Sequence, residues 1–258
     1  MDGKGLSVHL ILTVDYELFG NGLGCIDRCV IDPAERMMGI VQECLAPLTF
    51  IVEATEFIAM EAGGESVDGV RRQLALAVAQ GHDTQLHVHP QWEQAARLSD
   101  GAWHVDDHRW RMGDLPFEDT LRLLRTGKEW LEAVVNAADY RVTTFRAGGW
   151  CIQPSGAAVQ ALLKLGFRVD STVAPGFRNA ARGEWSDFRS VPRRPYWNVD
   201  GDVCREASSG LWEVPIVTGR IAAWRHLRAV KSSRTSGDGG FACGCEGNYL
   251  GPDGGWGM

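Results

Sequence analysis

Residues 81–92, GHDTQLHVHPQW, place His82, His87 and His89 within eight positions and then reach Pro90. The segment 83–89 alternates Thr, Leu and Val with polar residues, which predicts a strand that the proline ends. His87 and His89 are two positions apart, so both imidazoles can point to one face of that strand. The stretch therefore predicts where a strand of the sheet ends and where polar chemistry gathers.

Two further polar clusters also follow short apolar runs. Asp15 and Glu17 come directly after LSVHLILTV at 6–14, and Arg146 lies in TTFRAGGW. Barrels and open α/β folds place their chemistry at the carboxyl ends of their strands. We therefore expect the three clusters to meet at one edge of a sheet.

The rest of the chain alternates predicted strands with predicted helices. Apolar, β-branched segments predict strands, whereas segments with 3.6-residue periodicity and suitable terminal residues predict helices. This alternation indicates βαβ units and a parallel sheet. The predicted strands are 6–14, 48–54, 83–89, 141–148, 167–174 and 211–219; the predicted helices are 33–46, 66–81, 117–137 and 154–166; the stretches 93–115 and 175–210 are expected to be irregular.

The composition argues against several classes of protein. The chain has 258 residues, of which 45% are hydrophobic and 23% charged, as in an ordinary globular protein. Its net charge of −7 argues against nucleic-acid binding, which needs a basic surface. No apolar run is long enough for a signal peptide or a membrane span, and seven scattered cysteines indicate reduced thiols. We therefore expect no membrane association and a cytoplasmic location.

The residue types in these clusters suit metal chemistry. Two imidazoles, from His87 and His89, and one carboxylate, from Asp15 or Glu17, form a common ligand set for Zn²⁺ or another divalent first-row metal. The second carboxylate would then serve as general base toward a metal-bound water. The alternative is that HVH only ends a strand and that DYE only caps a turn or helix.

The order LTVDYE, LTFIVEA, GHDTQLHVHP, FRAGGW, GFRVDS and WEVP resembles the polysaccharide deacetylase family with the NodB homology domain, carbohydrate esterase family 4 (CE4). The resemblance covers about residues 6–220. It implies an α/β fold, a distorted (β/α)7 TIM-like barrel. It also implies a metal-dependent hydrolase that removes N- or O-linked acetyl groups from a carbohydrate or a related amide. The implied metal is zinc, with cobalt, nickel or manganese as alternatives.

The resemblance assigns roles to individual residues. Asp15 resembles the catalytic base of the family, and Arg146 resembles the arginine that orients this base. Glu17 and His87 resemble metal ligands. Asp170, in GFRVDS, is expected to pair with Arg146. In the implied mechanism the metal polarises the acyl carbonyl and carries the water, and Asp15 takes the proton of that water.

A carbohydrate or small acylated compound is the expected substrate, and it would lie at the rim of the sheet. The resemblance implies that a backbone N–H near Tyr16 helps to stabilise the oxyanion. Trp92 and Trp150 lie in or near the rim loops, where their rings could stack on sugars or instead fill the core. His82 matches a structural histidine of the family rather than a ligand.

Two positions depart from the family pattern. The second metal histidine is expected four residues after His87, where this chain has Gln91. We expect His89 to replace it, with Gln91 or water as the alternative ligand. The last family motif supplies a histidine as general acid from a late strand, but only His226 follows 211–219, in a helix-like segment. We therefore expect the barrel to be incomplete at its C-terminal end and to lack this acid.

The domain organisation follows from these observations. We expect one barrel domain over residues 1–230 and a Gly-rich, disordered tail over 231–258. The missing last motif makes a non-catalytic or impaired carbohydrate-binding relic one alternative function. Another amidohydrolase-like metalloenzyme is a second alternative, although its HxH motif normally follows the first strand. The sequence leaves the oligomeric state open.

Overall fold

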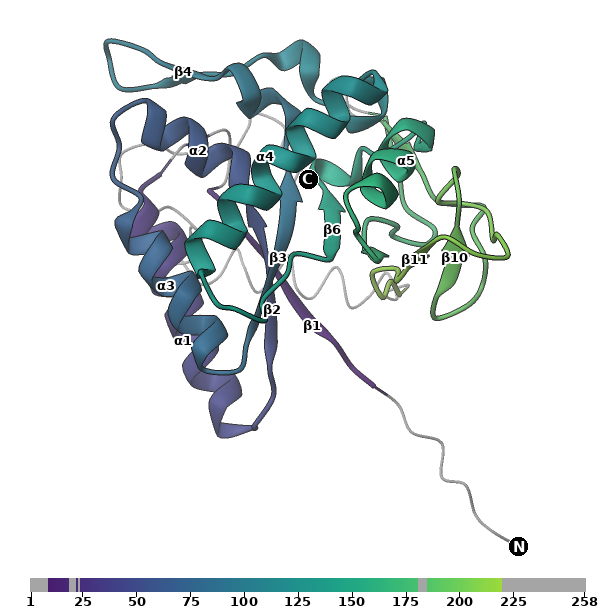
Figure 1. The fold of residues 1–258 in the computed structure, drawn as a ribbon, viewed down its shortest axis with the longest axis horizontal. Helices are drawn as coiled ribbons and strands as arrows, with labels where there is room; N and C mark the ends of the chain where they lie inside the picture. The colour runs from purple at the N-terminus through teal and green to yellow at the C-terminus, as the bar shows by residue number, and fades with distance from the viewer. Residues whose placement is uncertain (1–8, 19–21, 23, 181–184, 220–258) are drawn as a thin grey trace, which may run out of the picture.

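The computed structural model describes residues 9–18, 22, 24–180 and 185–219, and these build an α/β fold around a seven-stranded sheet (Figure 1). Neighbouring strands are parallel, except that the edge strand β10 is antiparallel to β11. In spatial order the strands are β1 (Leu12–Tyr16), β2 (Leu48–Glu53), β3 (Asp83–Val88), β6 (Thr144–Ala147), β7 (Val169–Asp170), β11 (Leu211–Glu213) and β10 (Trp197–Val199).

The predicted parallel α/β sheet is confirmed, but its closure into a barrel is not. Strands β1 and β10 form the two edges, and no pairing joins them within the described residues. The β10 end is built from strands of only two or three residues, and β10 runs against its neighbour. The sheet is therefore open in the described part of the chain.

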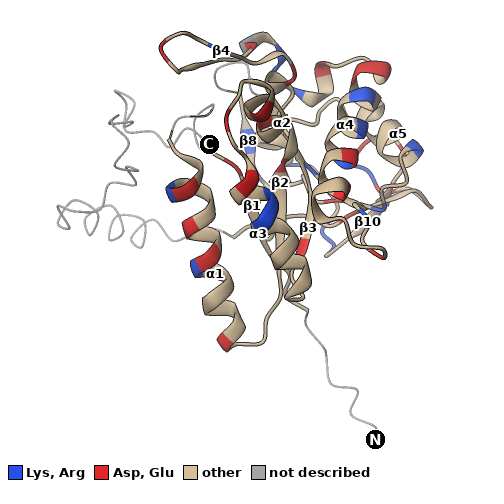
Figure 2. Cartoon of the chain, turned by 60° about the vertical axis from the view of Figure 1, so that its left-hand side comes forward, with Lys and Arg blue, Asp and Glu red and all other residues tan. Residues whose placement is uncertain are grey.

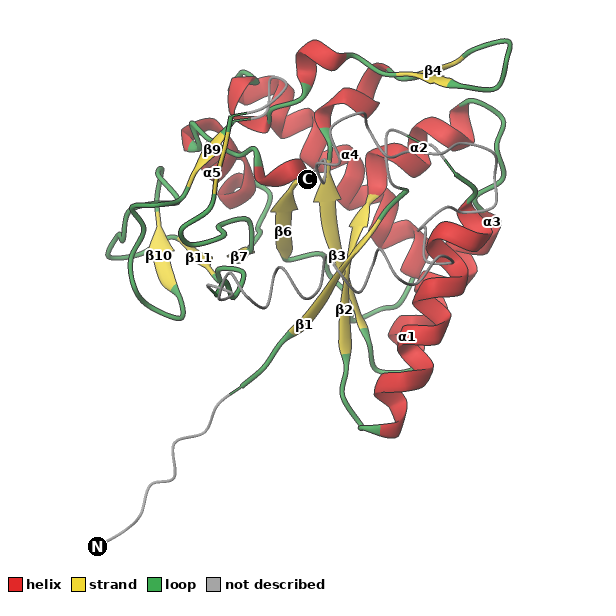
Figure 3. Cartoon of the chain, turned by 180° about the vertical axis from the view of Figure 1, so that it is seen from behind, coloured by secondary structure: helices red, strands yellow, loops and turns green. Residues whose placement is uncertain are grey.

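All four predicted helices are present, with ends that differ by a few residues. They are α1 (Asp32–Glu43), α3 (Asp68–Ala79), α4 (Phe117–Val135) and α5 (Gly156–Lys164). Helix α4 contacts α3 and α5 on either side and also packs on β3. Seen from behind, β1, β2 and β3 lie in front of the helices (Figure 3). The helices therefore cover mainly one face of the sheet.

One helix, α2 (Ala54–Ala62), is not predicted by the sequence patterns. It begins directly after β2, with no connecting loop. Five of its nine residues are buried, so its apolar side chains do not form the one-sided stripe that identifies a surface helix. The predicted second strand therefore runs straight into a buried helix, and Glu53 is the residue at the junction.

The core lies between the helices and the sheet. Phe50, Leu86 and Phe145 come from three neighbouring strands and are fully buried or nearly so. Burial of each such side chain contributes on the order of 1.5–3 kcal/mol. On the helix side, a Cβ at Gly127 of α4 would lie 2.9 Å from the Leu86 side chain. Helix α4 can therefore approach β3 closely only because this position has no side chain.

The two expected irregular stretches contain only short elements. Residues 93–115 include the antiparallel pair β4 (Ala96–Arg97) and β5 (Trp103–His104), which extends along the upper edge of Figure 1. Residues 175–210 include a second pair, β8 (Arg178–Asn179) and β9 (Ser186–Asp187), together with β10. The expected domain boundary at 230 and the tail 231–258 lie outside the described residues.

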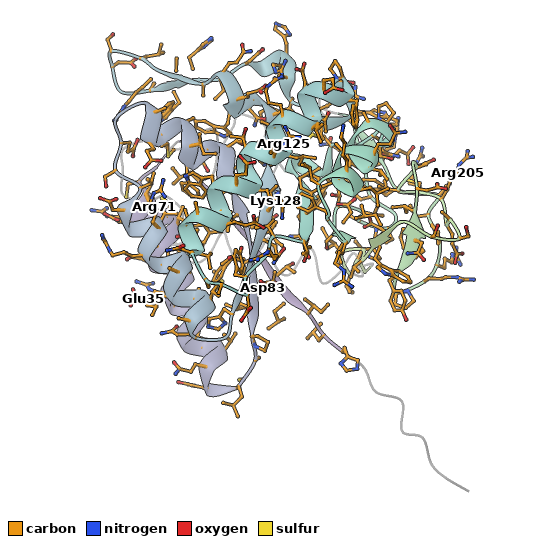
Figure 4. All side chains as sticks on the ribbon, in the orientation of Figure 1. Glu35, Arg71, Asp83, Arg125, Lys128 and Arg205 are labelled. Carbon is orange, nitrogen blue, oxygen red and sulfur yellow. The ribbon has the colours of Figure 1, made fainter. Side chains whose placement is uncertain are left out.

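The two ends of the sheet are easily told apart. Asp83 marks the start of β3 and lies low in Figure 4, and the arrow of β3 points upward in Figure 1, so the carboxyl ends of the strands lie at the top of these views.

Acidic and basic residues are intermixed along the helices in Figure 2, in keeping with the modest net charge of −7. Within the described residues, no helix combines the length and the apolar character that a membrane crossing requires.

Candidate functional site

The register of the sheet aligns the polar residues at its carboxyl end. Glu53 of β2 pairs with His87 of β3, and His87 pairs with Arg146 of β6. Tyr16 pairs with Val52, so Glu17 follows β1 at the level of Glu53. Residues at one level of a parallel sheet point to the same face. Glu17, Glu53, His87 and Arg146 therefore form one polar row across four neighbouring strands. The sequence predicts this position for all of them except Glu53.

The row ends in a compact group of metal-ligand atoms. Glu17, Glu53, His87 and His89 each offer one such atom, and the four atoms lie within 4.8 Å of one another. Glu17 Oε2 is 3.4 Å from His87 Nε2 and 3.0 Å from His89 Nε2. The two imidazole centroids are 4.9 Å apart. We call these four residues the Glu/His cluster.

His87 is fixed by the backbone of the next strand. Its Nδ1 lies 2.9 Å from the carbonyl oxygen of Arg146, which accepts a hydrogen bond when Nδ1 carries the proton. In the neutral form with the proton on Nδ1, Nε2 is the nitrogen left free to bind a metal ion, as in metal-binding histidines. In the protonated form the same Nε2 faces Glu17 Oε2 at 3.4 Å and can donate to it. Burial lowers the pKa of His87, but the charge and hydrogen bond of Glu17 outweigh it and the pKa is raised.

Glu17 is held by both imidazoles. Burial tends to raise the pKa of Glu17, but His89 and His87 outweigh it and lower the pKa well below its usual range. Glu17 is therefore a carboxylate, the form in which it can bind a cation.

His89 occupies a space that a glycine leaves open. A Cβ at Gly148 would lie 2.4 Å from Cγ of the His89 ring, so only glycine allows the imidazole to pack there. The Gln91 amide lies 3.2 Å from His89 Nδ1, and the Trp110 ring lies 6.1 Å from the imidazole centroid. His89 Nε2 is buried, and its partner is the carboxylate of Glu17 at 3.0 Å. The structure thus brings His89, the expected substitute ligand, into the cluster, while Gln91 contacts its far side.

Asp15 and Arg146 form the predicted pair. The Arg146 guanidinium donates to the Asp15 carboxylate, to Thr13 Oγ1 at 2.9 Å and to the Ser171 carbonyl oxygen at 2.9 Å. Arg146 is buried, whereas about a third of the Asp15 side chain is exposed. Asp15 is also near enough to His87 for its charge to raise the pKa of that residue. A held carboxylate therefore lies beside the cluster, with access to solvent.

No hydrogen bond or ion pair joins Asp170 to Arg146 within the described residues, although the charge of Arg146 tends to lower the pKa of Asp170. Asp170 pairs in register with Phe145, one position before Arg146, so its side chain points to the opposite face. It accepts a 2.5 Å hydrogen bond from Thr172 and shares a hydrogen bond with Glu213, its register partner on β11. Ser171, at the level of Arg146, is the residue that contacts the guanidinium.

Of the three residues expected to contact substrate, Tyr16 through a nearby backbone N–H and Trp92 and Trp150 through their rings, two have side chains in the core. The Tyr16 ring is 2% exposed and donates to Gln73 at 2.7 Å, because Tyr16 alternates with Asp15 and Glu17 along β1 and faces the helices. Trp92 is 3% exposed and packs edge-on against Trp103, 5.5 Å between centroids. Neither side chain is available to stack on a sugar.

The third, Trp150, is half-buried. Its ring meets Phe177 edge-on at 4.8 Å, and its backbone has a positive φ of 58°. It follows Gly148 in the loop that supports His89. Trp150 therefore stays a candidate for substrate contact.

Glu53 is the member of the cluster that the sequence interpretation overlooked. It ends β2 and caps α2 by accepting the Glu56 N–H at 3.1 Å, and Thr55 also donates to it. Burial raises the pKa of Glu53 to about 8. The rule that found Asp15 and Arg146, a polar residue at the carboxyl end of a strand, applies equally to Glu53.

His82 has the structural role that was expected. Its Nδ1 accepts the N–H of Leu48 at 3.1 Å, which ties the loop before β3 to the start of β2. Both elements lie at the amino end of the strands, away from the Glu/His cluster. His226, the late histidine, lies outside the described residues.

The donor set of the cluster fits a divalent metal ion. It combines imidazole nitrogens with carboxylate oxygens, the ligands of first-row divalent ions. One of its potential ligand atoms, Glu53 Oε2, is buried without a hydrogen bond within the described residues, whereas His89 Nε2 lies 3.0 Å from Glu17 Oε2. Buried polar atoms are normally paired, so the unpaired oxygen of Glu53 fits a site that takes up a cation.

No protein-family profile and no curated protein matches the chain. Similar solved structures include IcaB from Ammonifex degensii (TM-score 0.41, 15% identity, 86% of this chain and 74% of that one). A CE4 family pseudoenzyme from Bacillus anthracis has TM-score 0.39 and 14% identity over 62% of this chain and 41% of that one. The polysaccharide deacetylase Bc1974 from Bacillus cereus has TM-score 0.37 and 10% identity over 64% and 60%. The chain thus spans less than two thirds of the last two proteins. These last two proteins are described as a CE4 family protein and as a polysaccharide deacetylase, which is the family that the sequence motifs of this chain resemble.

Proposed function

We propose that this chain is a metal-dependent hydrolase that removes N- or O-linked acetyl groups from a carbohydrate or a related amide. The observation that carries the proposal is the Arg146-held carboxylate of Asp15 beside the Glu/His cluster. Glu17, His87 and His89 would hold the metal, with zinc as the first candidate and cobalt, nickel or manganese as alternatives. A metal in such a site polarises an acyl oxygen and lowers the pKa of bound water.

Asp15 acts as the general base in this proposal. A base must lie within hydrogen-bond reach of the proton that it removes, and its orientation must be held. Arg146 supplies that orientation, since three of its contacts fix the guanidinium and the fourth fixes Asp15. The exposed third of the Asp15 side chain gives a water molecule access to it.

The acyl group would be bound by the loop after β6 and by the backbone after β1. The N–H near Tyr16 is the proposed oxyanion donor, which requires no contribution from its buried ring. Trp150 and the half-buried Trp110 beside His89 are the aromatic surfaces available to a sugar ring.

The test is release of acetate from N-acetylated and O-acetylated oligosaccharides by protein loaded with Zn²⁺, Co²⁺, Ni²⁺ or Mn²⁺. Asp15→Asn should lower kcat by roughly 10²–10⁴-fold, because a general base contributes about that much. Glu61→Gln is the matched control, since Glu61 is an exposed residue of α2 paired with Arg71. Its activity should equal that of the wild type.

A different outcome would favour the binding relic. If the metal-loaded protein retains oligosaccharides but releases no acetate from any of them, the chain binds without catalysis. If it neither binds metal nor releases acetate, the proposal is wrong.

A further inference from the structure

Glu53 is a buried carboxyl group in which one oxygen accepts hydrogen bonds and the other has no hydrogen-bond partner within the described residues. It is 1% exposed. Its Oε1 accepts from Thr55 Oγ1 and from the Glu56 N–H, whereas Oε2 is buried with no hydrogen-bond partner. An unsatisfied buried polar oxygen costs on the order of 1–3 kcal/mol. This unpaired oxygen belongs to the residue on β2 that is the register partner of His87 on β3.

The surroundings of Glu53 point to a cation rather than a protein donor. One of its oxygens belongs to the four ligand atoms that lie within 4.8 Å of one another. The ion pairs of His87 and His89 both go to Glu17. Glu53 therefore has no ion pair with either imidazole within the described residues, although the charge of His89 tends to lower its pKa. An ion bound between the four residues would give Glu53 Oε2 the partner that it lacks.

The proposed function needs only three protein ligands and an open position for water or substrate. A fourth protein ligand changes the coordination number that an active metal must adopt. In tetrahedral zinc sites, four protein ligands leave no open position. A site with two imidazoles and two carboxylates stays open only if the ion accepts five or six ligands.

We propose that Glu53 is a fourth protein ligand, bound through a single oxygen, and that the cluster selects a five- or six-coordinate divalent first-row ion. This inference rests on the proposed metal site. The single-oxygen mode follows from the contacts of Oε1, which Thr55 and the Glu56 N–H already occupy. These two donors orient the carboxylate, as outer-shell partners do in metal sites.

The experiment is a Co²⁺ titration of metal-free protein, followed by calorimetry and by the visible absorption of the bound ion. Five- and six-coordinate Co²⁺ gives weak bands, whereas four-coordinate Co²⁺ gives intense ones. Wild-type protein should give weak bands. Glu53→Gln should bind Co²⁺ at least ~10-fold more weakly, the loss seen even for outer-shell changes, and should show altered bands.

The variant and its control separate ligand loss from misfolding. A glutamine at position 53 keeps an oxygen for the Glu56 N–H and for Thr55, so the cap of α2 is retained, which a thermal melt confirms. Glu61→Gln, an exposed carboxylate on the same helix, should bind Co²⁺ as the wild type does. Intense four-coordinate bands in the wild type, or unchanged binding by Glu53→Gln, would overturn the inference about Glu53 alone. Failure of the wild type to bind Co²⁺, Zn²⁺ or Mn²⁺ would overturn the proposed function as well.

Discussion

The guanidinium of Arg146 donates to the carboxylate of Asp15 across 131 positions of the chain. The two residues lie on strands separated by β2 and β3 in the sheet, so the side chain of Arg146 reaches over both. Thr13 and Ser171 bind the same guanidinium from either side. A network of this kind fixes the orientation of Asp15, the proposed base, through a residue that need not touch substrate.

The first prediction concerns this coupling. Arg146→Lys should lower kcat for acetate release by about 10²-fold, because a lysine cannot hold Asp15 and the two flanking oxygens together, and small misplacements cost that much. Asp15→Asn combined with Arg146→Lys should be no slower than Asp15→Asn alone, since residues that act as a unit are not additive. Losses that multiply in the double variant would show that Arg146 acts independently. Arg71→Lys, on the surface of α3, serves as the control.

The second prediction concerns the space beside His89. Gly148→Ala places a methyl group where the imidazole lies, so His89 must leave the cluster. Zn²⁺ affinity measured by calorimetry should fall by at least ~10-fold, comparable with the loss of an orienting partner. Gly39→Ala, at an open and exposed position of α1, should bind Zn²⁺ as the wild type does. Equal affinity of Gly148→Ala and wild type would mean that His89 is not a ligand.

The third prediction concerns pH and the buried pair Asp170 and Glu213. Burial, together with the charge of Asp170, raises the pKa of Glu213 well above 4.5, and burial raises the pKa of Asp170 to about 6. Between pH 4.5 and these raised values the folded state keeps protons that the unfolded state has released. The free energy of unfolding should therefore fall as pH rises through this window, by about 1.4 kcal/mol for each tenfold difference in proton affinity between the folded and unfolded states.

Glu213→Gln tests this directly. Glutamine can still donate to Asp170 but does not titrate, so the urea midpoint should change less between pH 5 and pH 8 than in the wild type. A variant with the same pH dependence as the wild type would exclude the pair as its source.

The fourth prediction concerns Tyr16. Tyr16→Phe removes the donor to Gln73 and leaves a buried amide oxygen unpaired, which should lower the free energy of unfolding by about 1–3 kcal/mol. KM for acetylated oligosaccharides should not change, because the ring faces the helices. Tyr196→Phe, at a residue 56% exposed, should leave stability unchanged. A raised KM in Tyr16→Phe would show that the Tyr16 side chain contributes to substrate binding, contrary to this prediction.

The sequence alone predicts the parallel sheet and most of the polar row. Glu17, His87 and Arg146 of this row each lie in or just after a recognisable apolar run, and that pattern depends only on local sequence. Asp170 has no direct bond to Arg146 within the described residues because it is level with Phe145, one position earlier on β6. Which residues of β6 and β7 share a level depends on inter-strand register, and register is not visible in either strand alone.

The oversights have similar physical causes. Helix α2 is buried on several sides, so it lacks the amphipathic pattern of a surface helix. Because the start of α2 was not predicted, the end of β2 at Glu53 was not recognised either. The antiparallel edge strand β10 has three residues within a long irregular stretch, too few to produce a periodic signal. Tyr16 and Trp92 show that aromatic composition near a site does not reveal which way a ring points.

Alternate residues of β1, β2, β3 and β6 face opposite sides of the sheet, which links the geometry of the Glu/His cluster to the packing of the core. Glu53, His87 and Arg146 share one level, and the level just before it carries Val52, Leu86 and Phe145, which pack the core. A one-residue deletion inside β3 would exchange the two sets, sending an imidazole into the apolar interior and a leucine to the solvent side. The packing of the core and the position of the cluster residues therefore depend on the same strand register, and a change in that register would alter both.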